Sequence, residues 1–116
     1  YIFPMRGAGL WGPIWGFVSL DSDMSTIYGA NFDHQGETPG LGAEISTDWF
    51  QAEFNGKEIY NDQGELVSIT VTKPGQEAPE EHSVDGVSGG TITSKGLQDM
   101  LLSGFESYSE FLQKKK

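Results

Sequence analysis

The sequence predicts an α+β domain, in which a largely antiparallel sheet carries helices packed against one of its faces. Short segments rich in β-forming residues, joined by hairpin-like turns, occupy the first part of the chain, and the one long amphipathic run comes at its end. At 116 residues the chain is long enough for one hydrophobic core but not for two. We therefore expect residues 1–116 to form a single domain.

A hairpin is predicted near the start of the chain. A glycine-rich entry, 7–12, leads into Ile14–Leu20, whose β-branched and aromatic residues predict a strand. The polar run 21–23 predicts a turn, and the loose alternation of Thr26–Phe32 predicts the returning strand of the hairpin.

A loop and a short helix are predicted next. A Pro-Gly pair within 35–42 is a strong turn signal, so we expect a loop there. The Ser-Thr-Asp run at 46–48 can cap a helix over Trp49–Asn55, with Gly56 just beyond the end of that helix. The apolar side of this helix would consist of Trp49, Phe50 and Phe54.

The second half of the chain predicts two strands and a long helix. Ile59-Tyr60 can form a short strand, and apolar residues alternate along Leu66–Thr72, which predicts another. Residues 73–83 are rich in proline and glutamate and predict a solvated connection. The final helix, with a break expected near Gly104, is predicted from apolar residues at steps of three and four: Leu97, Met100, Leu101, Phe105, Tyr108, Phe111 and Leu112.

Composition excludes several classes of function. The formal net charge is -10, and such a surface repels a phosphate backbone, so we expect no nucleic-acid partner. There is no cysteine, which excludes disulfides and thiolate metal or redox sites. No segment approaches the ~20 apolar residues that span a bilayer. Because the sequence opens at Tyr1 rather than Met, we expect it to be a fragment of a longer protein, whose membrane anchor would lie upstream.

Familiar catalytic and metal patterns do not appear in their proper context. His34 and His82 lack the spacing of metal ligands, so we expect no metal site. We expect no catalytic residue in the domain. Gly7–Gly12 has the spacing Gly-x-Gly-x-x-Gly, but it precedes a strand instead of linking a strand to a helix, so it does not predict a dinucleotide site.

The stretch Val84–Ser94 has the most unusual composition in the chain. It holds three glycines, four hydroxyl side chains and one carboxylate, with no basic residue, just before the final helix. Glycines let another molecule approach the backbone, and hydroxyls can cap a helix or act as nucleophiles. Taken alone, this composition favours a tight loop that ends in a helix N-cap.

Three segments together resemble the FMN-binding domain found in the C subunit of the sodium-pumping NADH:quinone oxidoreductase. A closely similar domain occurs in the G subunit of the Rnf electron-transport complex. The segments are Gly9–Gly16 (Gly-Leu-Trp-Gly-Pro-Ile-Trp-Gly), His34–Gly42 (His-Gln-Gly-Glu-Thr-Pro-Gly-Leu-Gly) and Asp85–Ser94 (Asp-Gly-Val-Ser-Gly-Gly-Thr-Ile-Thr-Ser). They occur in the order that the family has, and the resemblance runs from near Gly7 to about Met100.

The third segment matches the family pattern Asp-x-x-Ser/Thr-Gly-Ala-Thr, in which the last threonine carries FMN through a phosphoester bond. The resemblance therefore implies a covalent FMN on Thr91, with Gly90 standing where alanine is usual. The other residues that it implies for the flavin site are Asp85, Ser88, Gly89, Gly90, Thr38, Gly40, Leu41, Leu10 and Trp11.

The function implied by the resemblance is electron relay through FMN in a membrane NADH:quinone oxidoreductase linked to sodium transport, without independent substrate turnover. The implied partners are the other subunits of that complex and a magnesium-dependent flavin transferase, which takes FMN from FAD. In the family the domain lies on the extracytoplasmic (periplasmic) side of the inner membrane, tethered by an N-terminal transmembrane helix. Three alternatives stay open: an electron carrier of the Rnf type, a flavin-free binding or interaction domain of the same fold, and a stand-alone enzyme with noncovalent FMN.

Overall fold

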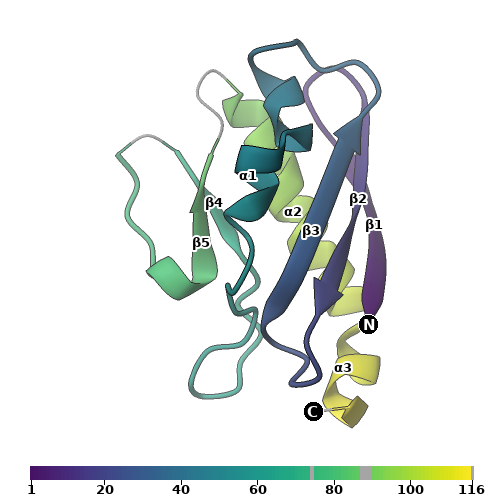
Figure 1. Cartoon of the computed structure of the whole chain (residues 1–116), viewed down its shortest axis with the longest axis vertical. Coiled ribbons are helices and arrows are strands. Elements are labelled where there is room, and N and C mark those ends of the chain that lie inside the picture. The colour runs from purple at the N-terminus through teal and green to yellow at the C-terminus, as the bar shows by residue number, and fades with distance from the viewer. Residues whose placement is uncertain (74, 87–89, 116) are drawn as a thin grey trace.

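The computed structural model describes residues 1–73, 75–86 and 90–115, and its centre is a three-stranded antiparallel sheet (Figure 1). Strands β1 (Ile2–Ala8), β2 (Pro13–Leu20) and β3 (Ile27–His34) are neighbours in the order β1-β2-β3. The predicted hairpin is therefore confirmed. Its turn is held by Asp23, whose carboxylate accepts hydrogen bonds from the backbone N–H groups of Ser25 and Thr26.

Strand β1 lies in a segment for which the sequence predicted no strand. Pro4 has no backbone N–H to donate to a neighbouring strand, and Gly7 lies near the end of the segment. Both residues weaken the sequence signal for a strand. The structure accommodates Pro4 because β1 pairs only with β2 and forms the edge of the sheet. Phe3 and Met5 alternate with exposed neighbours and face the core.

Helix α2 (Thr91–Ser107) covers one face of the sheet, and α3 (Ser109–Lys115) lies near the start of β1 (Figure 1). The predicted break near Gly104 is wrong, because α2 runs through Gly104 and the chain bends at Tyr108. Gly104 instead allows close packing: a Cβ there would lie 2.8 Å from the sulfur of Met5 on β1. The core between the sheet and the helices includes Ile14, Val18, Ile27, Leu97, Leu101 and Phe105.

A short 3₁₀-helix, η1 (Gly42–Ser46), and helix α1 (Asp48–Ala52) follow the loop after β3. The helix predicted over 49–55 is present but shorter. Thr47 stands at its N-cap, but the hydroxyl donates to the carbonyl three residues earlier, at 2.6 Å, instead of capping the first turn. Trp49, predicted on the apolar side, is 53% exposed, which corrects that prediction. The side chains that this segment buries are Phe50 and Phe54.

A second, two-stranded sheet lies beside the first (Figure 1) and departs from the antiparallel pattern. Strands β4 (Thr70–Thr72) and β5 (Ser83–Asp85) pair in parallel, and the 3₁₀-helix η2 (Glu80–His82) precedes β5. Helix α2 contacts β4, so this small sheet flanks the start of the final helix.

Two predicted strands are only partly present in this region. Of the strand predicted over 66–72, only β4 is present. Ser68 has a φ of 56°, in the left-handed region, which interrupts the extended chain before β4. The strand predicted at 59–60 is reduced to an isolated bridge between Tyr60 and Leu66. Alternation of apolar residues predicted an extended chain but not the pairing that would make it a long strand.

Candidate functional site

Three segments far apart in the sequence meet at the carboxylate of Glu37. Its Oε1 accepts a hydrogen bond from the N–H of Leu10 at 3.0 Å, and its Oε2 accepts one from the N–H of Trp11 at 2.8 Å. The hydroxyl of Thr93, in the first turn of α2, donates a third hydrogen bond to Oε1. Glu37 thus ties the β1–β2 loop and the loop after β3 to the start of the final helix.

Glu37 is buried, with only 4% of its surface exposed. Burial by itself raises the pKa of a carboxyl group, but the hydrogen bonds from Thr93, Trp11 and Leu10, together with the nearby His34, outweigh it. The pKa of Glu37 therefore lies below its usual value of 4.5, and the side chain is a buried carboxylate at neutral pH.

Two glycines make room for this carboxylate. A Cβ on Gly9 would lie 2.6 Å from Glu37 Oε1, and a Cβ on Gly42 would lie 2.5 Å from the hydroxyl oxygen of Thr93. Any larger residue would push the hydrogen-bonded atoms apart. These glycines of the first two family-like segments therefore serve the packing of Glu37 and Thr93.

A cavity of about 400 Å³, which we call the Trp11 cavity, opens beside this junction. Its volume falls in the range of roughly 300–1,000 Å³ that small-molecule sites occupy. Four exposed apolar side chains border it, with Trp11 66% exposed. Its lining consists of Leu10, Trp11, Glu37, Thr38, Leu41, Gly42, Gly90, Thr91, Ile92 and Thr93.

The first turn of α2 presents its hydroxyl groups unequally. Thr91 is exposed, whereas Thr93 is buried against Glu37 and Ser94 is buried as well. Gly90, at the N-cap, has a φ of -116° and a ψ of 37°, so its backbone does not require glycine. Of these three residues, at 91, 93 and 94, only Thr91 is exposed to solvent.

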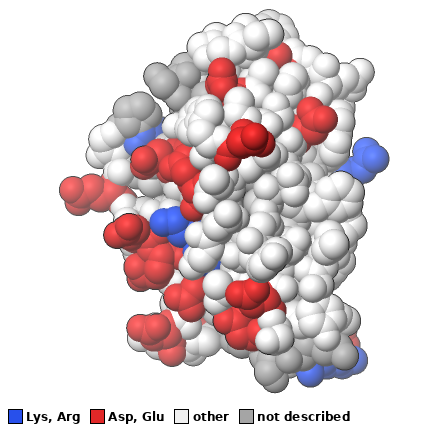
Figure 2. Space-filling model, viewed as in Figure 1, with Lys and Arg blue, Asp and Glu red and all other residues white. Residues whose placement is uncertain are grey.

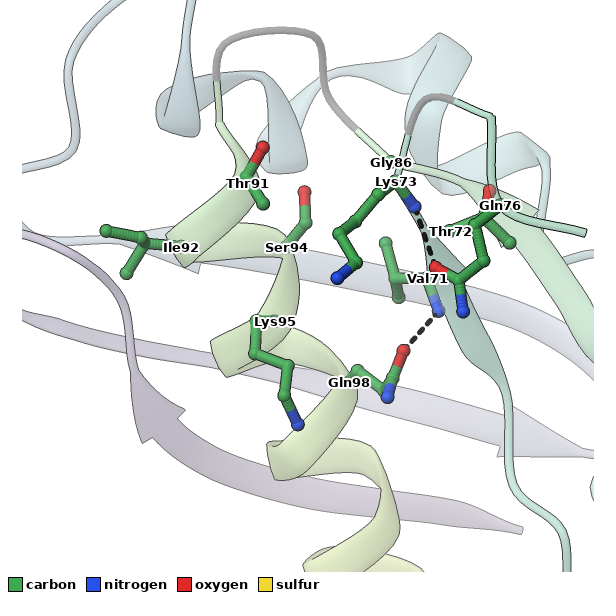
Figure 3. Close-up of a pocket in the computed structure, with 10 residues that line it drawn as sticks. All are labelled: Val71, Thr72, Lys73, Gln76, Gly86, Thr91, Ile92, Ser94, Lys95 and Gln98. Carbon is green, nitrogen blue, oxygen red and sulfur yellow. Dashed lines mark hydrogen bonds between the residues drawn. The ribbon is translucent and has the colours of Figure 1, made fainter.

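A second cavity of about 400 Å³, the Lys73 cavity, lies between the start of α2 and β4, and Thr91 lines it too (Figure 3). Side-chain amides brace its walls: Gln98 Oε1 accepts from the N–H of Val71 at 2.8 Å, and Gln76 Oε1 accepts from the N–H of Lys73 at 3.0 Å. Its lining consists of Val71, Thr72, Lys73, Gln76, Gly86, Thr91, Ile92, Ser94, Lys95 and Gln98.

The structure gathers most of the residues implied for the flavin site, but not all. Leu10, Trp11, Thr38, Leu41, Gly90 and Thr91 line one cavity. Gly40 does not line it; with a φ of 79° it forms the turn in which the N–H of Leu41 donates to the carbonyl of Thr38. Ser88 and Gly89 lie outside the described residues.

Asp85 lies elsewhere, at the end of β5, where it lines a different cavity with Glu53. Its backbone N–H donates to Glu53 Oε1 at 3.3 Å. Burial raises the pKa of Glu53, and the charge of Asp85 adds to that effect. The geometry therefore places Asp85 beside Glu53, at the C-cap of α1, and not in the Trp11 cavity.

The sequence did not single out Glu37 and Thr93 as site residues. Glu37 is one of 17 acidic residues, and nothing in its local pattern marks it as buried. The signal that could have revealed it is the pair of glycines at 9 and 42, which leave room for the Glu37 carboxylate. That signal can be interpreted only when the fold is known, because the two glycines lie in different loops.

The histidines do not form a site together. The Nδ1 of His34 accepts a hydrogen bond from the N–H of Glu37 at 3.2 Å, and the Nδ1 of His82 lies 2.6 Å from the carbonyl of Glu58. Within the described ranges, no group of three or more His, Asp or Glu side chains is placed to hold a metal ion. In the same ranges, no helix has the length and apolar character needed to cross a membrane.

On the face that Figure 2 shows, acidic side chains gather mostly on the side of β4 and β5. This distribution agrees with the formal net charge of -10. An anion that approaches this part of the molecule is therefore repelled unless lysines compensate locally.

The model of a family described as FMN-binding domain matches residues 9–105. Among curated relatives, the C subunit of the Na(+)-translocating NADH-quinone reductase of Neisseria meningitidis is 43% identical over 117 residues, covering 99% of this chain and 45% of the relative. The protein of the same name from Pseudomonas aeruginosa is 39% identical over 121 residues, covering 97% and 46%. The chain thus spans about half the length of the curated relatives it matches.

Two crystal structures have the same fold. That of the C subunit of the Na(+)-translocating NADH-quinone reductase from Parabacteroides distasonis superimposes with a TM-score of 0.91 at 57% identity, covering 97% of this chain and 56% of that one. That of NqrC from Shewanella oneidensis gives a TM-score of 0.81 at 31% identity, covering 97% and 54%. The comparisons confirm the α+β fold and the resemblance drawn from the three segments.

Proposed function

The chain belongs to the family of FMN-binding domains, and from that premise we propose that it carries FMN covalently on Thr91 and relays electrons in a sodium-translocating NADH–quinone reductase. In this proposal residues 1–116 are the FMN-binding domain of the C subunit of that reductase. The names of the relatives quoted above favour the sodium-translocating complex over an Rnf-type complex.

The exposure of Thr91 is the observation that carries this proposal. Thr91 lines the Trp11 cavity and its side chain is open to solvent, whereas the hydroxyls of Thr93 and Ser94 are buried. A transferase needs a hydroxyl that it can reach, on a backbone with little side-chain obstruction. Gly90 immediately before Thr91 supplies that access.

The attachment reaction balances with FAD as the donor. The hydroxyl oxygen of Thr91 forms an ester bond to the phosphorus on the FMN side of FAD, and the bond between the two phosphates of FAD breaks. AMP leaves with the electrons of that bond, and the hydroxyl proton passes to a base of the transferase. The first residue of a helix suits this role, because the free N–H groups at the helix start favour a negatively charged phosphate.

The residues of the Trp11 cavity suit a flat aromatic ring. Trp11, Leu10, Leu41 and Ile92 provide apolar surface, and the hydroxyl of Thr38 provides a hydrogen-bonding group at the rim. The buried bonds of Glu37 hold the two loops in place, so the cavity is shaped before any ligand enters. When bound, FMN supplies the ability to gain or lose one electron at a time.

The remaining parts of the proposal concern the whole protein. Its partners are the other subunits of the reductase and, during maturation, the flavin transferase. The protein is anchored in the inner membrane, with this domain on the extracytoplasmic side. In this proposal the domain alone performs no substrate turnover. Its exposed apolar side chains Trp11 and Leu41 suit close approach by another redox centre.

The visible spectrum after denaturation tests this function. The chain is produced together with an active flavin transferase, denatured in guanidinium and separated from small molecules. We expect the flavin absorption to stay with the polypeptide. Flavin that passes into the small-molecule fraction would indicate noncovalent binding, and a colourless polypeptide throughout would favour a flavin-free interaction domain.

A further inference from the structure

The Lys73 cavity has a charge opposite to that of the chain as a whole. Among the described residues that line it are Lys73 and Lys95 but no Asp or Glu, although the chain carries 17 acidic and only 7 basic residues. Hydroxyl and amide groups of Thr72, Ser94 and Gln76 add polar lining. A concave site with net positive charge in an acidic protein attracts anions.

The two lysines of this cavity differ in their partners. Lys95 Nζ lies 2.7 Å from Asp99 Oδ1, one helical turn further along α2. No carboxylate pairs with the ammonium of Lys73 in the part of the chain that the structure describes. Figure 3 shows the Lys73 side chain reaching into the space between β4 and α2, toward Ser94. Lys73 is therefore the cation whose charge is available to a ligand.

Thr91 lines the Lys73 cavity as well as the Trp11 cavity, so a group bound to its hydroxyl stands between the two. We infer that the Lys73 cavity is the phosphate site of the flavin, in which Lys73 compensates the negative charge, while the ring lies in the Trp11 cavity. This inference rests on the proposed function, because it takes Thr91 as the point of attachment.

The charge of the phosphodiester and the charge of Lys73 are equal and opposite. A phosphodiester carries one negative charge at neutral pH, and Lys73 supplies one positive charge. The stretch Val84–Ser94 contains no basic residue, so the compensation depends on the fold, which brings Lys73 from the end of β4 to the first turn of α2. Without Lys73, the lysine left among the described lining residues would be Lys95, whose charge is already paired with Asp99.

The test measures how much the covalent flavin stabilises each of four proteins: the wild type, Lys73→Gln, Lys95→Gln and Lys57→Gln. Each is prepared flavin-free and flavin-loaded, and loading with one FMN is checked by intact mass. The readout is the rise in thermal midpoint on loading, in low salt and in about 0.5 M salt, where charges are screened.

We expect the rise to be roughly 2–5 °C smaller in Lys73→Gln than in the wild type at low salt, and the difference to shrink at high salt. Lys57→Gln is the matched control and should behave like the wild type, and Lys95→Gln should lower the rise less than Lys73→Gln does. The charge of Lys95 is already paired with Asp99, and Lys57 Nζ donates to the carbonyl of Glu80, away from the cavity. An equal rise in Lys73→Gln and the wild type at low salt would overturn the inference.

Failure of the proposed function would give a different result, namely a wild-type protein that acquires no FMN mass. In that case a second measurement, of noncovalent binding, still tests the phosphate site. The flavin-free domain is titrated with FMN and with riboflavin, which lacks the phosphate, while amide resonances are followed by NMR. FMN but not riboflavin should shift the amides of Gly86 and Ser94, and Lys73→Gln should reduce those shifts severalfold. Equal shifts with both ligands, or none with either, would contradict a phosphate site in this cavity.

Discussion

The hydroxyl of Thr93 donates a hydrogen bond to the carboxylate of Glu37, which lies 56 residues earlier in the chain. Both side chains are buried, and the same carboxylate accepts two backbone N–H groups from the β1–β2 loop. This contact fixes the first turn of α2 against the loops that line the Trp11 cavity. It therefore sets the position of Thr91, two residues before Thr93.

Removing the charge of Glu37 should destabilise the domain. In Glu37→Gln, the side-chain NH₂ replaces one of the two oxygens that accept from Leu10, Trp11 and Thr93, so at least one buried donor loses its acceptor. We expect a loss of roughly 1.5–3 kcal/mol in the free energy of unfolding. Urea unfolding at neutral pH measures it. Glu77→Gln, at an exposed glutamate, is the control and should change stability by less than about 0.5 kcal/mol. Equal stabilities for the two variants would contradict the role given to Glu37.

The same residue predicts a dependence of stability on pH. Because the pKa of Glu37 is lowered in the folded protein, its carboxylate stabilises the fold fully above the unfolded value of 4.5, and this contribution is lost as the pH falls through the folded value. The stability difference between the wild type and Glu37→Gln should thus be largest at neutral pH and shrink below about pH 4.5. Urea unfolding across that range measures the difference. A gap that stays constant on acidification would show that Glu37 is not the titrating group.

The glycines of the β1–β2 loop should differ sharply in their tolerance to alanine. In Gly9→Ala the new Cβ would lie 2.6 Å from Glu37 Oε1, whereas nothing lies within 4 Å of a Cβ on Gly12. We expect Gly9→Ala to cost about 1–3 kcal/mol through overpacking and Gly12→Ala to be nearly neutral. Thermal unfolding of the two variants compares them directly. Equal tolerance at both positions would refute the close packing of the loop on Glu37.

Two exposed tryptophans offer a matched test of where the ring lies. Trp11 lines the cavity beside Thr91, whereas Trp49 on α1 does not. In the flavin-loaded protein, Trp11→Ala should shift the visible absorption and circular dichroism bands of the flavin, because the ring loses an aromatic wall. Trp49→Ala should leave these bands unchanged, and both variants should stay folded, since both side chains are more than half exposed. Identical spectra for Trp11→Ala and the wild type would place the ring elsewhere.

Local patterns in the sequence predicted much of the fold. The β2–β3 hairpin and the loop after β3 follow from β-formers and turn residues, and α2 follows from its apolar period. The length of β4 could not be predicted, because alternation does not reveal that Ser68 adopts a positive φ. Helix α2 also passes through Gly104, since packing against Met5 outweighs the low helix propensity of glycine.

The candidate site was predictable only in part. The three family-like segments contain Leu10, Thr38, Leu41 and Thr91, which the structure gathers around one cavity. The contacts between those segments depend on tertiary packing, so Glu37 could not be separated from the other acidic residues. Two lysines line the second cavity, and one of them, Lys73, reaches it from just after β4, which no pattern within Val84–Ser94 indicates.

The central claim is that Thr91 carries the flavin, and peptide mass mapping of matched variants tests it most directly. Wild type, Thr91→Ser and Thr91→Ala are each produced with the flavin transferase, digested, and the peptide that contains residue 91 is weighed. The wild type, and to a lesser extent Thr91→Ser, which keeps the hydroxyl, should carry the mass of FMN on that peptide, and Thr91→Ala should carry none while remaining folded. FMN retained on Thr91→Ala, or found on a different peptide of the wild type, would contradict the account.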